Sequence, residues 1–109
     1  RSDMTRALIN VPAKAKRGEI IAMKVLISHK METGFRYTTS GERIDRDIVH
    51  TFVASYNGDE IFRAELHPAI SANPFLAFHA VATESGTIEF KWFGDNGLAA
   101  RETAKISVE

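Results

Sequence analysis

The sequence predicts an all-β fold, and three observations carry this prediction. Apolar side chains recur at every second residue along most of the chain, as in Ile21, Met23, Val25 and Ile27, and this period is typical of half-buried strands. No segment shows a sustained apolar repeat of 3.6 residues, so almost no helix is expected. All seven glycines fall between the predicted strands, where turns need them. The pattern favours an immunoglobulin-like antiparallel β-sandwich, with a small closed barrel as the alternative.

The alternation places about seven strands along the chain. They lie near residues 6–11, 19–29, 48–56, 60–66, 75–82, 87–93 and 98–108. The dipeptide Asn57-Gly58 separates the third and fourth strands, and Asn-Gly between apolar runs is a strong hairpin signal. The run Gly94-Asp95-Asn96-Gly97 predicts a second tight turn, before the last strand.

Two connections stand out. The segment from Lys30 to Asp47 has 18 residues, and structureless loops longer than about 12–15 residues are uncommon in compact domains. Residues 35–38 and 43–44, separated by a turn at Ser40-Gly41, are therefore expected to form a small projecting hairpin. The second connection, residues 67–74, contains two prolines and an Ile70 that we expect to be exposed.

Length and charge restrict the class of protein. A chain of 109 residues is one domain, and residues 1–3 before Met4 are interpreted as a cloning remnant, which leaves 4–109 as the domain. Positive and negative charges balance at 14 each, so neither nucleic acid nor an acidic membrane surface is an expected partner. No apolar run is long enough for a membrane span. Met4 is followed by no apolar signal segment, which by itself suggests a cytoplasmic or a mature processed protein.

The chain has no cysteine. This excludes a disulfide scaffold, a thiolate nucleophile, a cysteine-based zinc site, an iron–sulfur cluster and a blue-copper site. The four histidines (His29, His50, His67 and His79) show no metal-ligand spacing, so surface or hydrogen-bonded roles are the simplest interpretation and no cofactor is expected. The alternative is a small copper-binding β-sandwich, because His29 and Met31 form a His-x-Met pattern that is soft enough for copper.

No catalytic set is visible. Ser28 and His29 are adjacent, so in a strand they point to opposite faces, whereas a nucleophile and its base must converge. The nearby carboxylates stand among Lys and Arg residues and are interpreted as a solvated charge mixture; they are Glu32, Glu42, Asp45 and Asp47. There is no phosphate-binding loop and no dinucleotide fingerprint. An enzyme with an unrecognised site remains the third class of function beside a partner-binding subunit and a copper protein.

Aromatic and methionine residues divide into two groups. One group occupies strand positions and is expected to form the core: Phe52, Phe62, Phe78, Phe90 and Trp92. The other lies in or beside loops: Met31, Phe35, Tyr37, Ile70 and Phe75. Such residues are enriched at protein interfaces, so the second group either forms a contact patch or is buried by the long loop folding back over it.

Three motifs resemble the SoxZ family of the bacterial sulfur-oxidation (Sox) system. They are Ser28-His29-Lys30-Met31-Glu32-Thr33-Gly34, then Asn73-Pro74-Phe75-Leu76-Ala77-Phe78, and Phe90-Lys91-Trp92-Phe93 followed by the turn at 94–97. The resemblance runs from about Val11 to the last residue. Lys30 stands where many members have proline, which loosens the entry into the loop.

The resemblance implies a non-catalytic subunit of a heterodimeric carrier complex in thiosulfate oxidation. It would bind and stabilise a SoxY-like partner whose cysteine, near its C-terminus, holds the sulfur substrate, and it would contact other Sox enzymes transiently. The complex would act in the periplasm, which this chain would reach by export together with its partner. The partner-binding residues expected on this basis are Ser28, His29, Met31, Glu32, Thr33, Gly34, Asn73, Pro74 and Phe75.

Overall fold

A computed structural model, which describes residues 6–29, 31–66 and 73–109, shows the predicted immunoglobulin-like β-sandwich. Its strands are β1 (Arg6–Asn10), β2 (Lys14–Ala15), β3 (Ile20–Ser28), β4 (Val49–Tyr56), β5 (Asp59–Glu65), β6 (Phe75–Val81), β7 (Gly86–Gly94) and β8 (Ala99–Val108), with a single 3-10 turn, η1 (Asp95–Gly97), between β7 and β8. In the described part of the chain no helix is long and apolar enough to cross a membrane.

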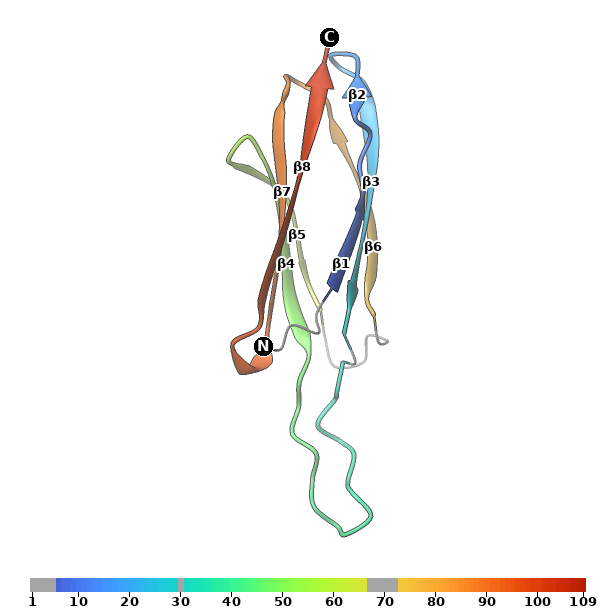
Figure 1. Ribbon diagram of the computed structural model, residues 1–109, viewed down its shortest axis with the longest axis vertical. Helices are drawn as coiled ribbons and strands as arrows, with labels where there is room; N and C mark the ends of the chain where they lie inside the picture. Colours follow the sequence, from blue (N-terminus) through green and yellow to red (C-terminus); the bar gives the residue numbers. More distant parts are fainter. Residues whose placement is uncertain (1–5, 30, 67–72) are drawn as a thin grey trace.

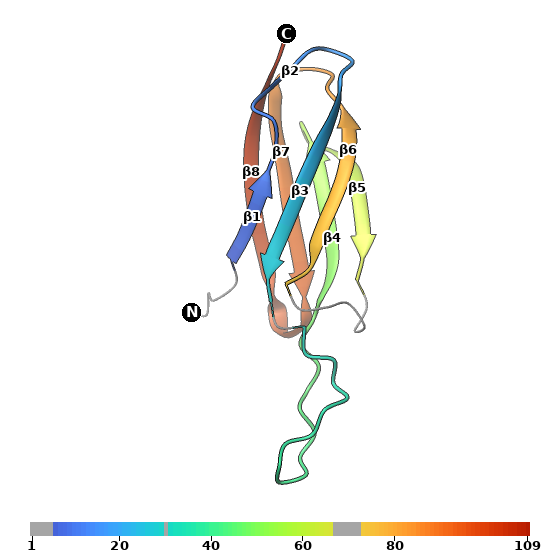
Figure 2. The same ribbon diagram turned by 90° about the vertical axis from the view of Figure 1, so that its right-hand side faces the viewer.

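The strands form two separate sheets, which excludes the closed barrel (Figures 1 and 2). One sheet has three strands in the order β1-β3-β6, and the other has five in the order β2-β8-β7-β4-β5. All seven predicted strands are present. The eighth, β2, was not predicted. Its two residues pair in parallel with Ser107 and Val108 at the far end of the chain, and a strand of two residues is too short for an alternation of side chains to indicate this pairing.

The core lies between the two sheets and is built on an aromatic cluster. Phe52 on β4 packs against Trp92 with ring centroids 5.1 Å apart, and it also contacts Phe78 and Phe90. Phe62, which is half-buried, stacks on Phe78 at 4.4 Å. The predicted aromatic core is thus confirmed. The opposite wall is β3, on which Ile21, Met23, Val25 and Ile27 are all buried.

The two predicted turns are confirmed. Asn57 and Gly58, between β4 and β5, both have positive φ, 49° and 89°, which is the backbone that a two-residue hairpin of matching twist requires. The run 94–97 contains η1 and joins β7 to β8.

β3, β5 and β7 end at the same end of the sandwich, where β4, β6 and β8 begin (Figures 1 and 2). At this end residues 31–48, between β3 and β4, project far beyond the sheets. The projecting segment accounts for the elongated shape of 60 × 26 × 19 Å. The predicted hairpin is confirmed by backbone hydrogen bonds from Thr38 to Glu42 and from Ile44 to Arg36. Lys30, His67 and Ile70 lie outside the described residues.

We expect Tyr56→Phe to destabilise the fold. The buried hydroxyl of Tyr56 donates to the carbonyl of Glu84 and accepts from the amides of Thr83 and Glu84, so its removal leaves backbone groups without partners. The free energy of unfolding should fall by roughly 1–3 kcal/mol in chemical denaturation. Tyr37→Phe is the matched control, because Tyr37 is 66% exposed and its loss of hydroxyl should cost less than about 0.5 kcal/mol. Equal effects of the two changes would refute this role.

Candidate functional site

The β3–β4 connection forms an arm, a name used here for residues 32–47. Its base is closed by two backbone hydrogen bonds of 2.8 Å between Glu32 and Asp47, one in each direction. Further out, Tyr37 and Arg43 form a second antiparallel bridge. Backbone pairing along both sides gives this long segment a defined shape, although it carries no named strand.

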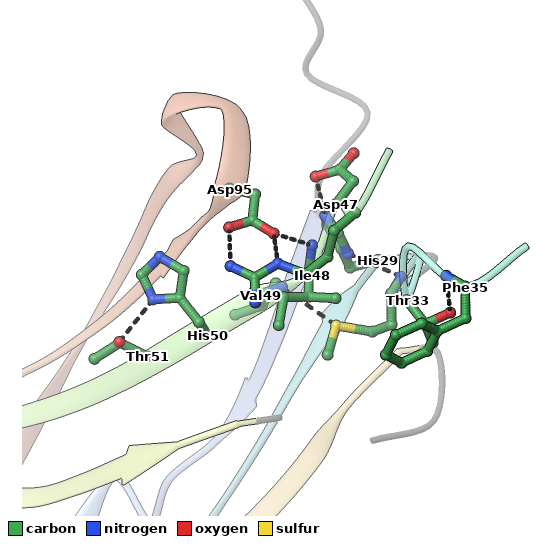
Figure 3. Close-up of polar contacts among 11 residues, drawn as sticks. His29, Thr33, Phe35, Asp47, Ile48, Val49, His50, Thr51 and Asp95 are labelled. Carbon is green, nitrogen blue, oxygen red and sulfur yellow. Dashed lines mark hydrogen bonds and ion pairs between the residues drawn. The ribbon is translucent and has the colours of Figure 1, made fainter. Parts of the chain in front are cut away.

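His29 joins three segments where β3 enters the arm. Its backbone amide donates to the side-chain oxygen of Asn73 at 2.8 Å, and its carbonyl accepts from the amide of Asn73 at 2.7 Å. Its Nδ1 accepts from the amide of Met31 at 3.0 Å, so in the neutral ring the hydrogen is on Nε2. That Nε2 lies 3.6 Å from Asp47 Oδ1 (Figure 3). His29 therefore connects the entry of the arm to its return strand and to the start of β6.

Met31 is part of the core rather than of the surface. Only 4% of the residue is exposed, and its φ of 54° turns the backbone back towards the sandwich. Its sulfur accepts from the amide of Val49, the first residue of β4, at 3.3 Å. Met31 was considered as part of a contact patch, but in this chain it is buried. A charge placed at Met31 would disrupt packing, so such a variant could not test an interface.

The first turn of the arm is held by local polar contacts. Arg36 donates two hydrogen bonds to the buried carboxylate of Glu32, at 2.6 and 3.0 Å. These bonds, and the negative charge of Glu32, raise the pKa of Arg36 above its ordinary value. The Thr33 hydroxyl accepts from the amide of Phe35 at 3.1 Å (Figure 3). Glu32 and Thr33 thus shape the arm, and both were among the predicted site residues.

The second half of the arm, which leads back to β4, is fixed to the β7–β8 turn. Arg46 donates from two nitrogens to the two carboxylate oxygens of Asp95, both at 2.9 Å. Asp95 also accepts from the amide of Ile48 at 3.1 Å (Figure 3). The hydrogen bond from Arg46 is the main reason why the pKa of Asp95 lies below its ordinary value. Neither Arg46 nor Asp95 was predicted, because 49 residues separate them.

The remaining predicted residues lie beside the base of the arm. Ser28 is exposed at the end of β3, and Asn73 has a positive φ of 54° where β6 begins. Pro74 is buried, and its carbonyl accepts from the amide of Ile27 at 3.2 Å. Phe75 is 56% exposed. The second motif therefore contributes structural contacts through Asn73 and Pro74 and an exposed aromatic ring through Phe75.

The loop aromatics are exposed in the isolated chain. Phe35 is 79% and Tyr37 66% exposed, both on the arm. Of the five residues considered as a contact patch, Phe35, Tyr37 and Phe75 are exposed, Met31 is buried, and Ile70 is outside the described residues. The arm does not fold back over the exposed rings.

The donor atoms of the proposed copper pair are already engaged. His29 Nδ1 accepts one backbone amide and Met31 Sδ another. Within residues 6–29, 31–66 and 73–109, no group of three His, Asp or Glu side chains is arranged to hold a metal ion. The geometry gives the copper interpretation no support.

Gly34→Ala should destabilise the protein more than Gly41→Ala does. Both glycines have nearly the same positive φ, 88° and 89°, so the backbone strain of an added Cβ is matched. At Gly34 that Cβ would stand 3.0 Å from Arg46 Cβ, whereas at Gly41 nothing lies within 4 Å. Chemical denaturation should show a difference of roughly 1 kcal/mol. Equal losses would mean that the close approach at Gly34 has no energetic weight.

The contact between Arg46 and Asp95 should weaken in acid. The folded-state pKa of Asp95 is lowered, so its stabilising effect is complete above the unfolded-state pKa of about 3.9 and is lost as the pH falls through the lower folded-state pKa. Stability measured by denaturation from about pH 6 downwards should fall less steeply in Asp95→Asn than in wild type. Asp45→Asn, at an exposed carboxylate of the arm, should follow the wild-type curve. Parallel curves for Asp95→Asn and wild type would contradict this assignment.

Solved structures share the fold of this chain. Superoxide reductase (neelaredoxin) from Ignicoccus hospitalis matches with a TM-score of 0.75 and 17% identity, over 96% of this chain and 82% of that one. The sulfur carrier protein SoxY from Chlorobium limicola f thiosulfatophilum matches with a TM-score of 0.66 and 11% identity, over 94% and 78%. A putative superoxide reductase from Thermotoga maritima gives 0.63 and 20%, over 94% and 85%. At these identities the likeness shows the fold alone.

The family comparison is more specific. No curated protein matches the sequence, but the family described as sulphur oxidation protein SoxZ matches residues 9–105. The match extends over nearly the whole sandwich together with the arm and both motifs at its base. The chain belongs to the SoxZ family of the Sox sulfur-oxidation system.

Proposed function

We propose that this chain is the non-catalytic subunit of a heterodimeric sulfur-carrier complex in thiosulfate oxidation. It binds and stabilises a SoxY-like subunit, whose cysteine near the C-terminus holds the sulfur substrate. The complex acts in the periplasm, which the chain reaches together with its partner, and it is contacted transiently by the other Sox enzymes.

The SoxZ match over residues 9–105 is the observation that carries this proposal. The absence of cysteine agrees with it, because a covalent sulfur carrier needs a nucleophilic thiolate and this chain has none. A subunit without the reactive atom contributes by supporting the one that has it.

Co-expression with a SoxY protein tests the proposal. We expect a 1:1 complex by gel filtration with multi-angle light scattering. After incubation with thiosulfate and the other Sox enzymes, mass spectrometry should find sulfur adducts on the SoxY subunit and none on this chain.

The matched control replaces the SoxY cysteine with serine. That complex should still form, but it should carry no sulfur, which separates assembly from substrate binding. Sulfur bound covalently to this chain, or turnover by the isolated chain, would overturn the proposal. So would failure of the two wild-type chains to associate.

A further inference from the structure

The outer face of the three-stranded sheet carries several exposed apolar side chains. Here the outer face means the side chains of β1, β3 and β6 that alternate with the core residues. Leu8, Leu26 and Phe75 form one row across the three strands, because Leu26 pairs with Leu8 on one side and Phe75 on the other. Leu8 is 62% exposed. The row lines a shallow hollow on this face.

The apolar character continues to the opposite end of the same sheet. Ile20 pairs with Val81, and the two are 68% and 49% exposed. Between this pair and the row of Leu8, Leu26 and Phe75 the outer face carries two alanines, Asn10, His79 and Lys24. No carboxylate occurs at its described positions on β1, β3 and β6.

The outer face of the five-stranded sheet has the opposite character. Glu89 forms ion pairs with Lys91 and Arg101, and Arg63 pairs with Glu60 on the edge strand β5. Antiparallel sheets that meet water show this polar outer pattern, whereas strands covered on both faces are apolar throughout. β3 has the second pattern, with the sequence IIAMKVLIS.

We propose that the outer face of the three-stranded sheet is the surface that docks the SoxY-like subunit. This inference rests on the proposed function and adds the location of the interface. An apolar sheet face of this extent marks an interaction site rather than a solvated surface.

The size of the face agrees with a subunit interface. β3 has nine residues, so with about 3.3 Å per residue and about 4.8 Å per strand the face measures roughly 30 by 14 Å. This flat projection of roughly 400 Å² is already about half of the ~800 Å² that each partner contributes to a standard interface. The accessible area of the face is larger than this projection because its side chains protrude, and the exposed aromatic residues of the neighbouring arm add further area.

Lys24 indicates that the occupant is a different chain and not a second copy. It is the central residue of the central strand, it is exposed, and it forms no ion pair with a described residue. In a two-fold symmetric dimer whose axis passes through the centre of this face, the two copies of Lys24 would lie close together. Two like charges in a desolvated contact oppose association. A SoxY-like partner avoids this repulsion and offers an acceptor or a carboxylate opposite Lys24.

The test compares two exposed phenylalanines in the co-expressed complex. Phe75→Asp, on the proposed face, should raise the dissociation constant by at least about thirtyfold, because aromatic side chains buried in an interface are frequent hot spots. Phe93→Asp is the matched control: Phe93 is 38% exposed on the outer side of β7, in the other sheet, and its change should leave affinity within about twofold. Thermal unfolding of each isolated variant verifies that it is folded.

A second variant keeps the test decisive if Phe75→Asp does not fold. Lys24→Glu changes an exposed polar side chain and should accelerate dissociation about tenfold, because it reverses the charge at the centre of the contact. If wild type binds SoxY but both face variants bind equally well, the inference is wrong and the proposed function stands. If wild type does not bind SoxY, the proposed function itself fails. A homodimer of the isolated chain that Phe75→Asp disrupts would make a second copy the occupant and overturn the inference.

Discussion

β3 carries apolar side chains on both of its faces, apart from Lys24 and Ser28 on the outer one, and the packing of the sandwich depends on this strand. Its inner side chains, from Ile21 to Ile27, form with Phe78 of the neighbouring β6 the wall that faces the aromatic residues of β4 and β7. Its outer side chains form the centre of a second apolar surface. Burial of apolar area stabilises by roughly 25 cal/mol per Å². One face satisfies this tendency within the chain, and the other can satisfy it only against another molecule.

The same strand leads directly into the base of the arm. Ser28 ends β3, and His29 begins the set of contacts that ties the arm to the β5–β6 connection. On the other side the arm is tied to the β7–β8 turn through Arg46 and Asp95. The base is therefore fastened to both sheets. A segment that is long and mostly exposed keeps its direction because its two ends are fixed, not because its middle is packed.

The strands were predictable from the sequence because their signal is local. An alternation such as Ile88, Phe90 and Trp92 reports burial of one face without any knowledge of the neighbouring strands. The contacts at the base of the arm had no such signal. His29 and Asn73 are 44 residues apart, and only the folded topology brings them together. The first two motifs that resemble SoxZ contain residues at the base of the arm, but the motifs did not reveal which of their side chains make structural contacts.

Met31 illustrates why the site was harder to predict than the fold. A methionine in a polar loop has the composition of an interface residue, yet its positive φ directs the side chain into the core. The apolar row on the outer face was missed for the opposite reason. Leu8, Leu26 and Phe75 come from three separate strands and become neighbours only in the register of the sheet. In both cases the residue type was typical of an interface. Whether each side chain lies in the core or on the surface depended on the backbone conformation and on the pairing of distant strands.

The distribution of charge on the chain affects the rates at which a partner would bind to this face and leave it. The chain carries no net charge, and on the five-stranded sheet Glu60 and Glu89 are held in ion pairs. Long-range electrostatic attraction therefore contributes little to the diffusional encounter of the two subunits. We expect an association rate constant typical of a neutral pair of proteins, about 10⁵–10⁶ M⁻¹s⁻¹. Under the proposed function, the stability of the complex must then come from slow dissociation. At the docking surface that we propose, burial of the row of Leu8, Leu26 and Phe75 would slow dissociation, because these side chains must be exposed again before the partner can leave.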